Sequence, residues 1–290
     1  MNIQWYPGHM TKTRRMIEAD LKLVDLVAEV IDARIPRSSR NPDIDELVGS
    51  KPRLIVLNRA DQADPVLNKA WGKWFRDRGC AVLETDSKTG KGVDQFSNVT
   101  KEALKEQIAR WREKGQVGRP VRVMVVGVPN VGKSTFINKI AKRKSAKAQD
   151  RPGVTRGKQW VAVDAGLDLL DTPGILWPKF EDQEVGRRLA YTGAIKDDIM
   201  DVEELGCTLM EELAARYPQA LSDRYKLTPE PGTPGWELLE AAGHKRGFLI
   251  SGGDVDLNRM ARVLLDEFRG GKLGRFTLEI PEGVGADGAE

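Results

Sequence analysis

The sequence predicts an α/β protein in which a largely parallel sheet with covering helices is followed by a smaller, all-helical domain. Short apolar segments alternate with helical stretches in the first part of the chain, whereas past Pro178 apolar residues recur at helical spacing. With 290 residues the chain can bury one mid-sized core and one smaller core. We therefore expect the sheet within residues 1–178 and the helical domain within residues 179–290.

Six apolar segments are predicted strands. Their bounds are Leu26–Asp32, Leu54–Leu57, Ala81–Thr85, Val121–Val126, Gln159–Asp164 and Leu167–Leu170. The last two flank Ala165 and Gly166, and we expect them to form a hairpin. Polar motifs follow directly after two other strands, beginning at Asn58 and at Gly127. Because ligands of open α/β sheets bind at the carboxyl ends of strands, both motifs lie where a binding site is expected.

The helices are predicted from apolar spacing and from capping residues. An amphipathic helix is expected at Lys12–Leu23, and the last helix has a possible N-cap at Asp254. The second domain has two apolar stripes: Val202, Leu205, Leu209 and Leu213 in one helix, and Leu257, Met260, Ala261, Leu264, Leu265 and Phe268 in another. Thr228–Gly235 is the predicted connector between them, and Gly283–Glu290 is a predicted frayed tail.

Composition excludes several classes of protein. The chain has 46 Lys and Arg residues and 43 Asp and Glu residues, a formal net charge of +3, so nucleic-acid contact would require local basic clusters. Cys80 and Cys207 are too few and too far apart for a disulfide framework or a zinc site. No apolar run approaches the roughly 20 residues of a membrane span, and Met1–Arg15 has no apolar signal core. We expect a soluble, cytoplasmic protein with neither a membrane nor a DNA partner.

Residues 127–134 have the sequence GVPNVGKS, which matches the pattern of a phosphate-binding loop. In such a loop, backbone N–H groups and the N-terminus of the following helix surround the phosphates. Lys133 would place its charge at the β and γ oxygens, and Ser134 would place its hydroxyl on Mg²⁺. The loop follows a Val-rich strand and precedes a predicted helix, which favours a phosphate site over a glycine turn without a ligand.

The segment Asp171–Gly174 is a candidate for the element that meets Mg²⁺ and the γ-phosphate. We expect Asp171 to hold Mg²⁺ through water and the Gly174 N–H to contact the γ-phosphate. The pattern is weak alone because it also describes a simple turn, but here it follows a strand. Thr155 lies in the predicted first switch, residues 145–157, and is a candidate for a second Mg²⁺ hydroxyl. A loop threonine without a ligand is the alternative.

Residues 58–61, Asn-Arg-Ala-Asp, match a guanine-reading element. The Asp61 carboxylate can accept hydrogen bonds from guanine N1–H and the 2-amino group, and adenine offers neither donor there. Arg59 stands where lysine is usual, and its flat guanidinium can stack on the base. An Asn/Asp turn after a strand is the alternative. Residues 86–88 follow the next strand and resemble a weaker element, whose backbone contacts guanine O6. The predicted contacts to GTP or GDP are therefore Asn58, Arg59, Ala60, Asp61, Asp86, Ser87, Lys88, Asn130, Val131, Gly132, Lys133, Ser134, Thr135 and Gly174.

The order of these motifs is rotated, because an ordinary GTPase has the guanine-reading element after the phosphate loop. The rotated order resembles the circularly permuted ribosome-assembly GTPases. The resemblance covers nearly the whole chain, and its further segments are Trp5–Met10, Asp32–Pro36, Ser38–Pro42, Asp171–Pro178 and Lys245–Gly253. It implies a circularly permuted P-loop GTPase domain, and a cytoplasmic bacterial GTPase that binds the maturing large ribosomal subunit and its rRNA.

Ile175 stands where many GTPases have a glutamine that orients water, so another group must do this. The resemblance supports His9 as a catalytic residue, with Lys133; a structural or RNA-contacting role of His9 is the alternative. Asn130 resembles the asparagine that holds K⁺ in potassium-activated GTPases, and a loop-capping asparagine is the alternative. The expected cofactors are therefore Mg²⁺ and K⁺.

The predicted function is a GTP hydrolase that acts as a nucleotide-dependent switch in late assembly of the large ribosomal subunit. The helical domain follows directly after Asp171–Gly174, the predicted second switch, so a movement there would tilt it. Two basic clusters, within residues 139–151 and 259–275, can contact RNA backbone; a solvated charged face is the alternative for each. The alternative function is a regulatory module in which nucleotide gates a protein partner and turnover is incidental.

Overall fold

The computed structural model describes residues 10–145, 160–164, 166–172 and 182–285. Six strands form one sheet in the order β3-β2-β1-β4-β6-β5. Their bounds are β1 Leu26–Asp32, β2 Arg53–Asn58, β3 Ala81–Thr85, β4 Val121–Val126, β5 Trp160–Asp164 and β6 Leu167–Asp171. Neighbouring strands are parallel except for the β5–β6 hairpin, which is antiparallel. The predicted parallel sheet and its hairpin are confirmed, with strand ends within one residue of the expected positions.

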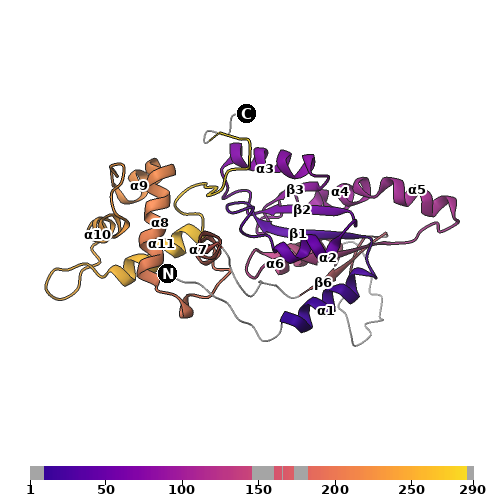
Figure 1. Cartoon of the computed structure of the whole chain (residues 1–290), viewed down its shortest axis with the longest axis horizontal. Coiled ribbons are helices and arrows are strands. Elements are labelled where there is room, and N and C mark those ends of the chain that lie inside the picture. The colour runs from indigo at the N-terminus through magenta and orange to yellow at the C-terminus, as the bar shows by residue number, and fades with distance from the viewer. Residues whose placement is uncertain (1–9, 146–159, 165, 173–181, 286–290) are drawn as a thin grey trace. The chain divides into compact units, whose positions relative to one another are not determined.

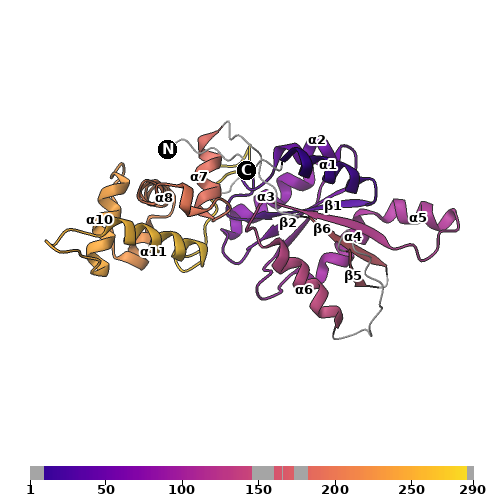
Figure 2. The ribbon, with the colours of Figure 1, turned by 90° about the horizontal axis from the view of Figure 1, so that it is seen from below.

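Helices cover both faces of this sheet (Figures 1 and 2). On one face lie α1 Met10–Leu21, α2 Pro42–Val48 and α3 Pro65–Asp77, and on the other lie α4 Phe96–Ala103 and α6 Lys133–Ser145. The short turn η1 Val93–Gln95 leads into α4, and α5 Lys105–Glu113 has no buried residue. All seven residues of β1 are buried, as expected for a central parallel strand between two layers of helices.

Residues in the second half of the chain form a separate helical unit, Phe180–Leu278. Its elements are α7 Gln183–Tyr191, η2 Asp197–Ile199, α8 Val202–Arg216, α9 Pro218–Tyr225, α10 Gly235–Arg246 and α11 Leu257–Arg269. α8 packs against α10 and α11, and a Cβ atom on Gly206 would lie 2.7 Å from the Ala261 Cβ. This glycine therefore permits the close approach of α8 and α11. Every predicted apolar residue of these two helices is buried except Leu257.

The start of α11 corrects one prediction. Asp256, not Asp254, is the N-cap, and its carboxylate accepts the Arg259 N–H at 2.9 Å. The chain first makes a bridge between Leu249 and Val255, in which the Ile250 N–H donates to the Asp254 carbonyl. Because this turn uses Asp254, the helix begins two residues later. Among the described residues, no helix combines the length and apolar composition needed to span a lipid bilayer.

The C-terminal segment from Glu279 belongs to the sheet-containing unit rather than to the helical unit. The Glu279 side chain is 4% exposed, and its carboxylate accepts from the Arg37 N–H at 2.5 Å, from the Ser38 N–H at 3.0 Å and from the Ser38 hydroxyl. The Glu279 carbonyl accepts from Trp71 Nε1 at 3.0 Å. A single domain boundary at residue 178 therefore does not predict that the chain returns to the sheet-containing unit at Glu279. A contact made by one buried carboxylate produces no recognisable pattern of apolar residues in the sequence.

We expect Glu279→Ala to release this segment, because three donors on residues 37 and 38 would lose a buried acceptor. The free energy of unfolding should fall by about 2 kcal/mol. Urea unfolding measures this change, and limited proteolysis should cut the C-terminal segment faster. Glu282→Ala is the matched control, since the Glu282 side chain is 74% exposed. Identical behaviour of the two variants would contradict an anchoring role of Glu279.

Candidate nucleotide-binding site

The loop between β4 and α6 is shaped by its glycines. A Cβ atom on Gly127 would lie 2.5 Å from the Val30 carbonyl oxygen, and one on Gly132 would lie 2.4 Å from Asn58 Nδ2. Asn130 and Gly132 have φ angles of 61° and 92°. These left-handed conformations bend the loop around a concave backbone, and α6 begins immediately afterwards at Lys133. The geometry is that of a phosphate-binding loop leading into a helix N-terminus.

Lys133 joins this loop to the end of β6. Its Nζ lies 2.6 Å from Asp171 Oδ1 and also contacts the Thr172 carbonyl. The Thr172 hydroxyl in turn donates to the Val125 carbonyl at 2.7 Å, which fixes the end of β6 against β4. The two motifs predicted to meet the β- and γ-phosphates are therefore adjacent in the fold.

The buried side chain of Asn58 connects the loop with the ends of β2 and β3. Asn58 Nδ2 donates to the Val131 carbonyl at 2.7 Å. Asn58 Oδ1 accepts from the Thr85 hydroxyl at 3.1 Å, from the Ser87 N–H at 3.1 Å and from the Ser87 hydroxyl at 2.7 Å. Thr85 is a site residue that the motifs do not predict; its only signal in the sequence is its position at the end of a predicted strand.

Arg59 and Asp61 continue the same element past the strand end. Arg59 adopts a φ of 59°, and its Nη2 donates to the Asn130 carbonyl at 3.0 Å. Asp61 is exposed, and the Ala60 N–H donates to the Thr85 carbonyl at 3.1 Å. A cavity of about 480 Å³ is lined by Arg59, Val128, Pro129, Asn130, Gly132, Lys133, Ser134 and Thr135. Residues predicted from two distant motifs thus line one cavity.

The loop at residues 86–88 is held by its own side chains. The Asp86 carboxylate accepts from the Lys88 N–H at 2.9 Å, from the Thr89 N–H at 3.3 Å and from the Thr89 hydroxyl. Burial opposes the charge on Asp86, but these hydrogen bonds prevail and lower its pKa below the usual value. The Asp86 carboxylate shapes the loop, and the Ser87 side chain faces Asn58. The exposed Lys88 remains at the surface of the loop.

The donors available for a metal ion are oxygen atoms. Ser134 is exposed at the first turn of α6, and the Asp171 carboxylate lies beside Lys133. Hydroxyl and carboxylate oxygens suit Mg²⁺, which usually binds few protein ligands together with phosphates. In the part of the chain that the structure describes, no group of three His, Cys, Asp or Glu side chains can hold a metal ion alone. His9, Thr155, Gly174 and Ile175 lie outside the described residues.

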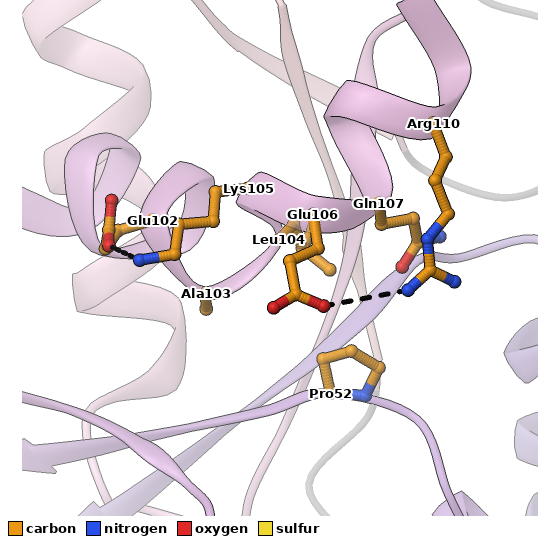
Figure 3. Close-up of a pocket in the computed structure, with 8 residues that line it drawn as sticks. All are labelled: Pro52, Glu102, Ala103, Leu104, Lys105, Glu106, Gln107 and Arg110. Carbon is orange, nitrogen blue, oxygen red and sulfur yellow. Dashed lines mark hydrogen bonds and ion pairs between the residues drawn. The ribbon is translucent and has the colours of Figure 1, made fainter. Parts of the chain in front are cut away.

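Figure 3 shows a different cavity, of about 300 Å³, where α4 meets α5. Its charged side chains are paired with one another: Lys105 with Glu102 at 2.6 Å, and Arg110 with Glu106 at 3.6 Å. None of the predicted site residues lines it. Because its charges are already compensated, this cavity offers no net charge to a phosphate.

The basic cluster on α11 is only partly available for RNA. Arg269 binds Asp197 through Nη1 and Nη2, at 2.8 and 2.7 Å, and also donates to the carbonyls of Ala190 and Tyr191. The Arg269 guanidinium therefore ties α11 to residues 190–197 within the helical unit. Arg262, Lys272 and Arg275 are exposed. In the other cluster, Lys139 donates to the Lys88 carbonyl at 3.2 Å.

Comparison with known proteins gives consistent results. A family model described as a 50S ribosome-binding GTPase matches residues 122–216. The ribosome biogenesis GTPase A of Priestia megaterium is 48% identical over 97% of this chain and 98% of that protein. The protein of the same name in Thermotoga maritima is 31% identical over 97% of this chain and 96% of that protein. A GDP-bound structure of YlqF from T. maritima has a TM-score of 0.69 at 29% identity, covering 92% of this chain and 100% of that one.

The rotated motif order, the phosphate loop at the end of β4 and full-length similarity at this level agree with one another. The chain therefore belongs to the ribosome biogenesis GTPase A family of circularly permuted GTPases, and it is a GTP hydrolase.

Proposed function

We propose that this protein binds GTP and GDP in the cavity beside the phosphate loop and acts as a nucleotide-dependent switch in late assembly of the large ribosomal subunit. One observation carries the nucleotide site: Asn58 Nδ2 donates to the Val131 carbonyl at 2.7 Å. This bond joins the guanine-reading element to the phosphate loop, so one ligand with a base and phosphates can reach both.

Each part of the nucleotide has a candidate partner. The backbone N–H groups of residues 130–135 and the Lys133 ammonium would bind the β- and γ-phosphates. Asp61, exposed beyond β2, would accept from guanine N1–H and the 2-amino group. Ser87, held by Asn58, would fix the backbone that faces guanine O6. Asp86 and Lys88 would contribute through the shape of this loop, and Gly174 would contact the γ-phosphate.

Two cations fit the oxygen donors of the site. Ser134 and Thr155 would hold Mg²⁺ through their hydroxyls and Asp171 would hold it through water; the ion supplies charge stabilisation for phosphoryl transfer. Asn130 would hold K⁺ near the phosphates. The side-chain amide oxygen of Asn130 is the proposed ligand of K⁺. His9 would orient the attacking water, because the aliphatic Ile175 has no hydrogen-bonding group.

The ribosomal role rests on the relatives. Proteins named ribosome biogenesis GTPase A match this chain over nearly its full length, and the matching family model is described as 50S ribosome-binding. A role in bacterial ribosome assembly supports the expected cytoplasmic location. The exposed side chains of Arg262, Lys272 and Arg275 would bind rRNA phosphates without reading sequence. GTP would favour the domain arrangement that binds the subunit, and hydrolysis would release it.

Guanine specificity should depend on Asp61. The wild-type protein should bind GDP at least about a thousandfold more tightly than ADP, because adenine leaves the carboxylate without a donor. Asp61→Asn should move the preference toward xanthine, whose 2-oxo group accepts a hydrogen bond. Calorimetry with GDP, ADP and XDP measures this, with Asp77→Asn on the exposed end of α3 as control. Comparable binding of ADP to the wild type would refute the assignment of residues 58–61.

Turnover should depend on K⁺ and on His9. We expect slow intrinsic GTP hydrolysis that is several-fold faster in K⁺ than in Na⁺, since a K⁺ ion at Asn130 would offset charge at the phosphates. His9→Ala should lower turnover stimulated by large subunits by about 10²-fold or more while leaving GDP affinity nearly unchanged. Phosphate release and GDP titration provide the two readings. Equal rates of GTP hydrolysis in K⁺ and in Na⁺ would refute a K⁺ site at Asn130. Unchanged turnover of His9→Ala would refute a catalytic role of His9.

Binding to the large ribosomal subunit should depend on nucleotide. A non-hydrolysable GTP analogue should support co-sedimentation with isolated subunits, and GDP should not. Arg262→Glu should weaken the analogue-dependent binding several-fold, since a phosphate contact is lost and a repulsion is gained. Lys226→Glu, an exposed charge reversal in the same helical unit, is the control. Equal sedimentation with GDP and with the analogue would exclude a switch, even if binding itself is tight.

A further inference from the structure

The segment Asp32–Pro36 has no role in the proposed function, yet it contains the most deeply buried charges next to the site. Asp32 ends β1 opposite Asn58 in the parallel register and is 1% exposed. Arg34 is 0% exposed and donates a hydrogen bond to each carboxylate oxygen of Asp32, from Nε to Oδ1 at 2.9 Å and from Nη2 to Oδ2 at 2.7 Å. The backbone N–H of Arg34 donates a third hydrogen bond to this carboxylate, to Oδ1 at 3.0 Å.

A second arginine approaches the same carboxylate from the guanine-reading element. Arg59 Nε lies 3.6 Å from Asp32 Oδ2, while Arg59 Nη2 donates to the Asn130 carbonyl at 3.0 Å. The guanidinium therefore spans from the end of β1 to the phosphate loop. These two contacts fix the position of the guanidinium. Arg59 therefore has a structural role in addition to the expected stacking on the base.

Both ends of this bridge have an unusual backbone. Arg59 and Asn130 have φ angles of 59° and 61°. Left-handed conformations are unfavourable for residues other than glycine and persist only where surrounding contacts hold them. The bond from Arg59 to the Asn130 carbonyl connects these two positions directly. It thereby helps to fix the part of the loop that leads into Gly132 and Lys133.

The charges around Asp32 support this arrangement. Burial opposes the charge on Asp32, but the ion pair and hydrogen bonds from Arg34 prevail and lower its pKa, with a further contribution from Arg59. Burial lowers the pKa of Arg59, while Asp32 and Asp61 favour its charged form. One carboxylate thus lies between two guanidinium groups.

We propose that Asp32 is a positioning residue for nucleotide binding: it holds the Arg59 guanidinium against the Asn130 carbonyl and so keeps the phosphate loop in its binding conformation. The inference rests on the proposed GTP site. An arginine suits this task because Nε and Nη2 can serve two partners at once, whereas a lysine ammonium sits on a single point. Arg59 is thus a bridge between strand β1 and the loop as well as part of the guanine-reading element.

The bridge predicts a specific pattern of affinities. Asp32→Asn and Arg59→Lys should each weaken binding of GDP and of a GTP analogue about tenfold, because both nucleotides need the same loop. For Asp32→Asn, the preference for GDP over ADP and the kcat at saturating GTP should change less than twofold, since Arg59, Asp61 and the catalytic groups are all retained. The loss therefore appears in KM and in faster nucleotide dissociation rather than in kcat.

A double-mutant cycle tests the coupling. Affinity for GDP is measured for the wild type, for Asp32→Asn, for Arg59→Lys and for the double variant, with thermal unfolding to confirm that each is folded. If both residues act through one contact, the double variant should be no weaker than the weaker single variant. Losses that multiply to about a hundredfold would overturn the proposal. Arg76→Lys, exposed in the last turn of α3, is the control and should bind like the wild type.

Asp32→Asn removes the charge of a carboxylate that is paired with the buried Arg34, so this variant can fail to fold. In that case Arg59→Lys and Arg59→Gln decide the matter. Both should release GDP about tenfold faster, because neither side chain can bridge the two partners. Wild-type dissociation from Arg59→Lys would overturn the proposal, since a single contact to the Asn130 carbonyl would then suffice. Failure of the wild type to bind GDP at all would instead refute the proposed function.

Discussion

At the carboxyl end of β2, the buried amide of Asn58 bonds to two other segments at once. Its nitrogen donates to the phosphate loop, and its oxygen accepts three hydrogen bonds from Thr85 and Ser87. Loss of this amide would leave several buried polar groups without partners, each costing about 1–3 kcal/mol. The close approach also explains Gly132, because any Cβ atom there would lie 2.4 Å from the Asn58 side chain. The site is therefore a single unit built from three loops.

The rotated chain order leaves this unit intact because strand pairing does not depend on the order of connection. β1 lies between β2 and β4, so the strand that leads to the guanine-reading element is only one strand away from the phosphate loop. Their carboxyl ends point the same way, as parallel pairing requires. Rotation needs only a connection from β3 to β4, which α4, α5 and the following loop supply. The motifs therefore meet at one edge of the sheet although their order along the chain is rotated.

Arginine has structural roles here as well as surface ones. Arg34 is completely buried against Asp32, and Arg269 is bound by Asp197 and two backbone carbonyls. Burying a guanidinium is costly unless its charge and its N–H groups are matched, and both residues meet this condition. Clusters of basic residues in a sequence therefore overstate the number of basic side chains that are exposed. The exposed basic residues that remain, such as Arg262 and Arg275, are fewer than the sequence indicates.

The fold class, the strands and the positions of the motifs predicted to bind nucleotide all follow from the sequence alone. These features have local signals: apolar alternation with helical stretches, and polar motifs at strand ends such as Asn58 and Gly127. Three features appear only in the folded structure: the return of Glu279 to the sheet-containing unit, the bridge from Asp32 through Arg59 to Asn130, and the binding of Arg269 by Asp197. Each depends on one or two polar contacts between residues distant in sequence. Such contacts leave no periodic pattern and no fixed residue spacing in the sequence, because they form only between side chains that the folded chain brings together.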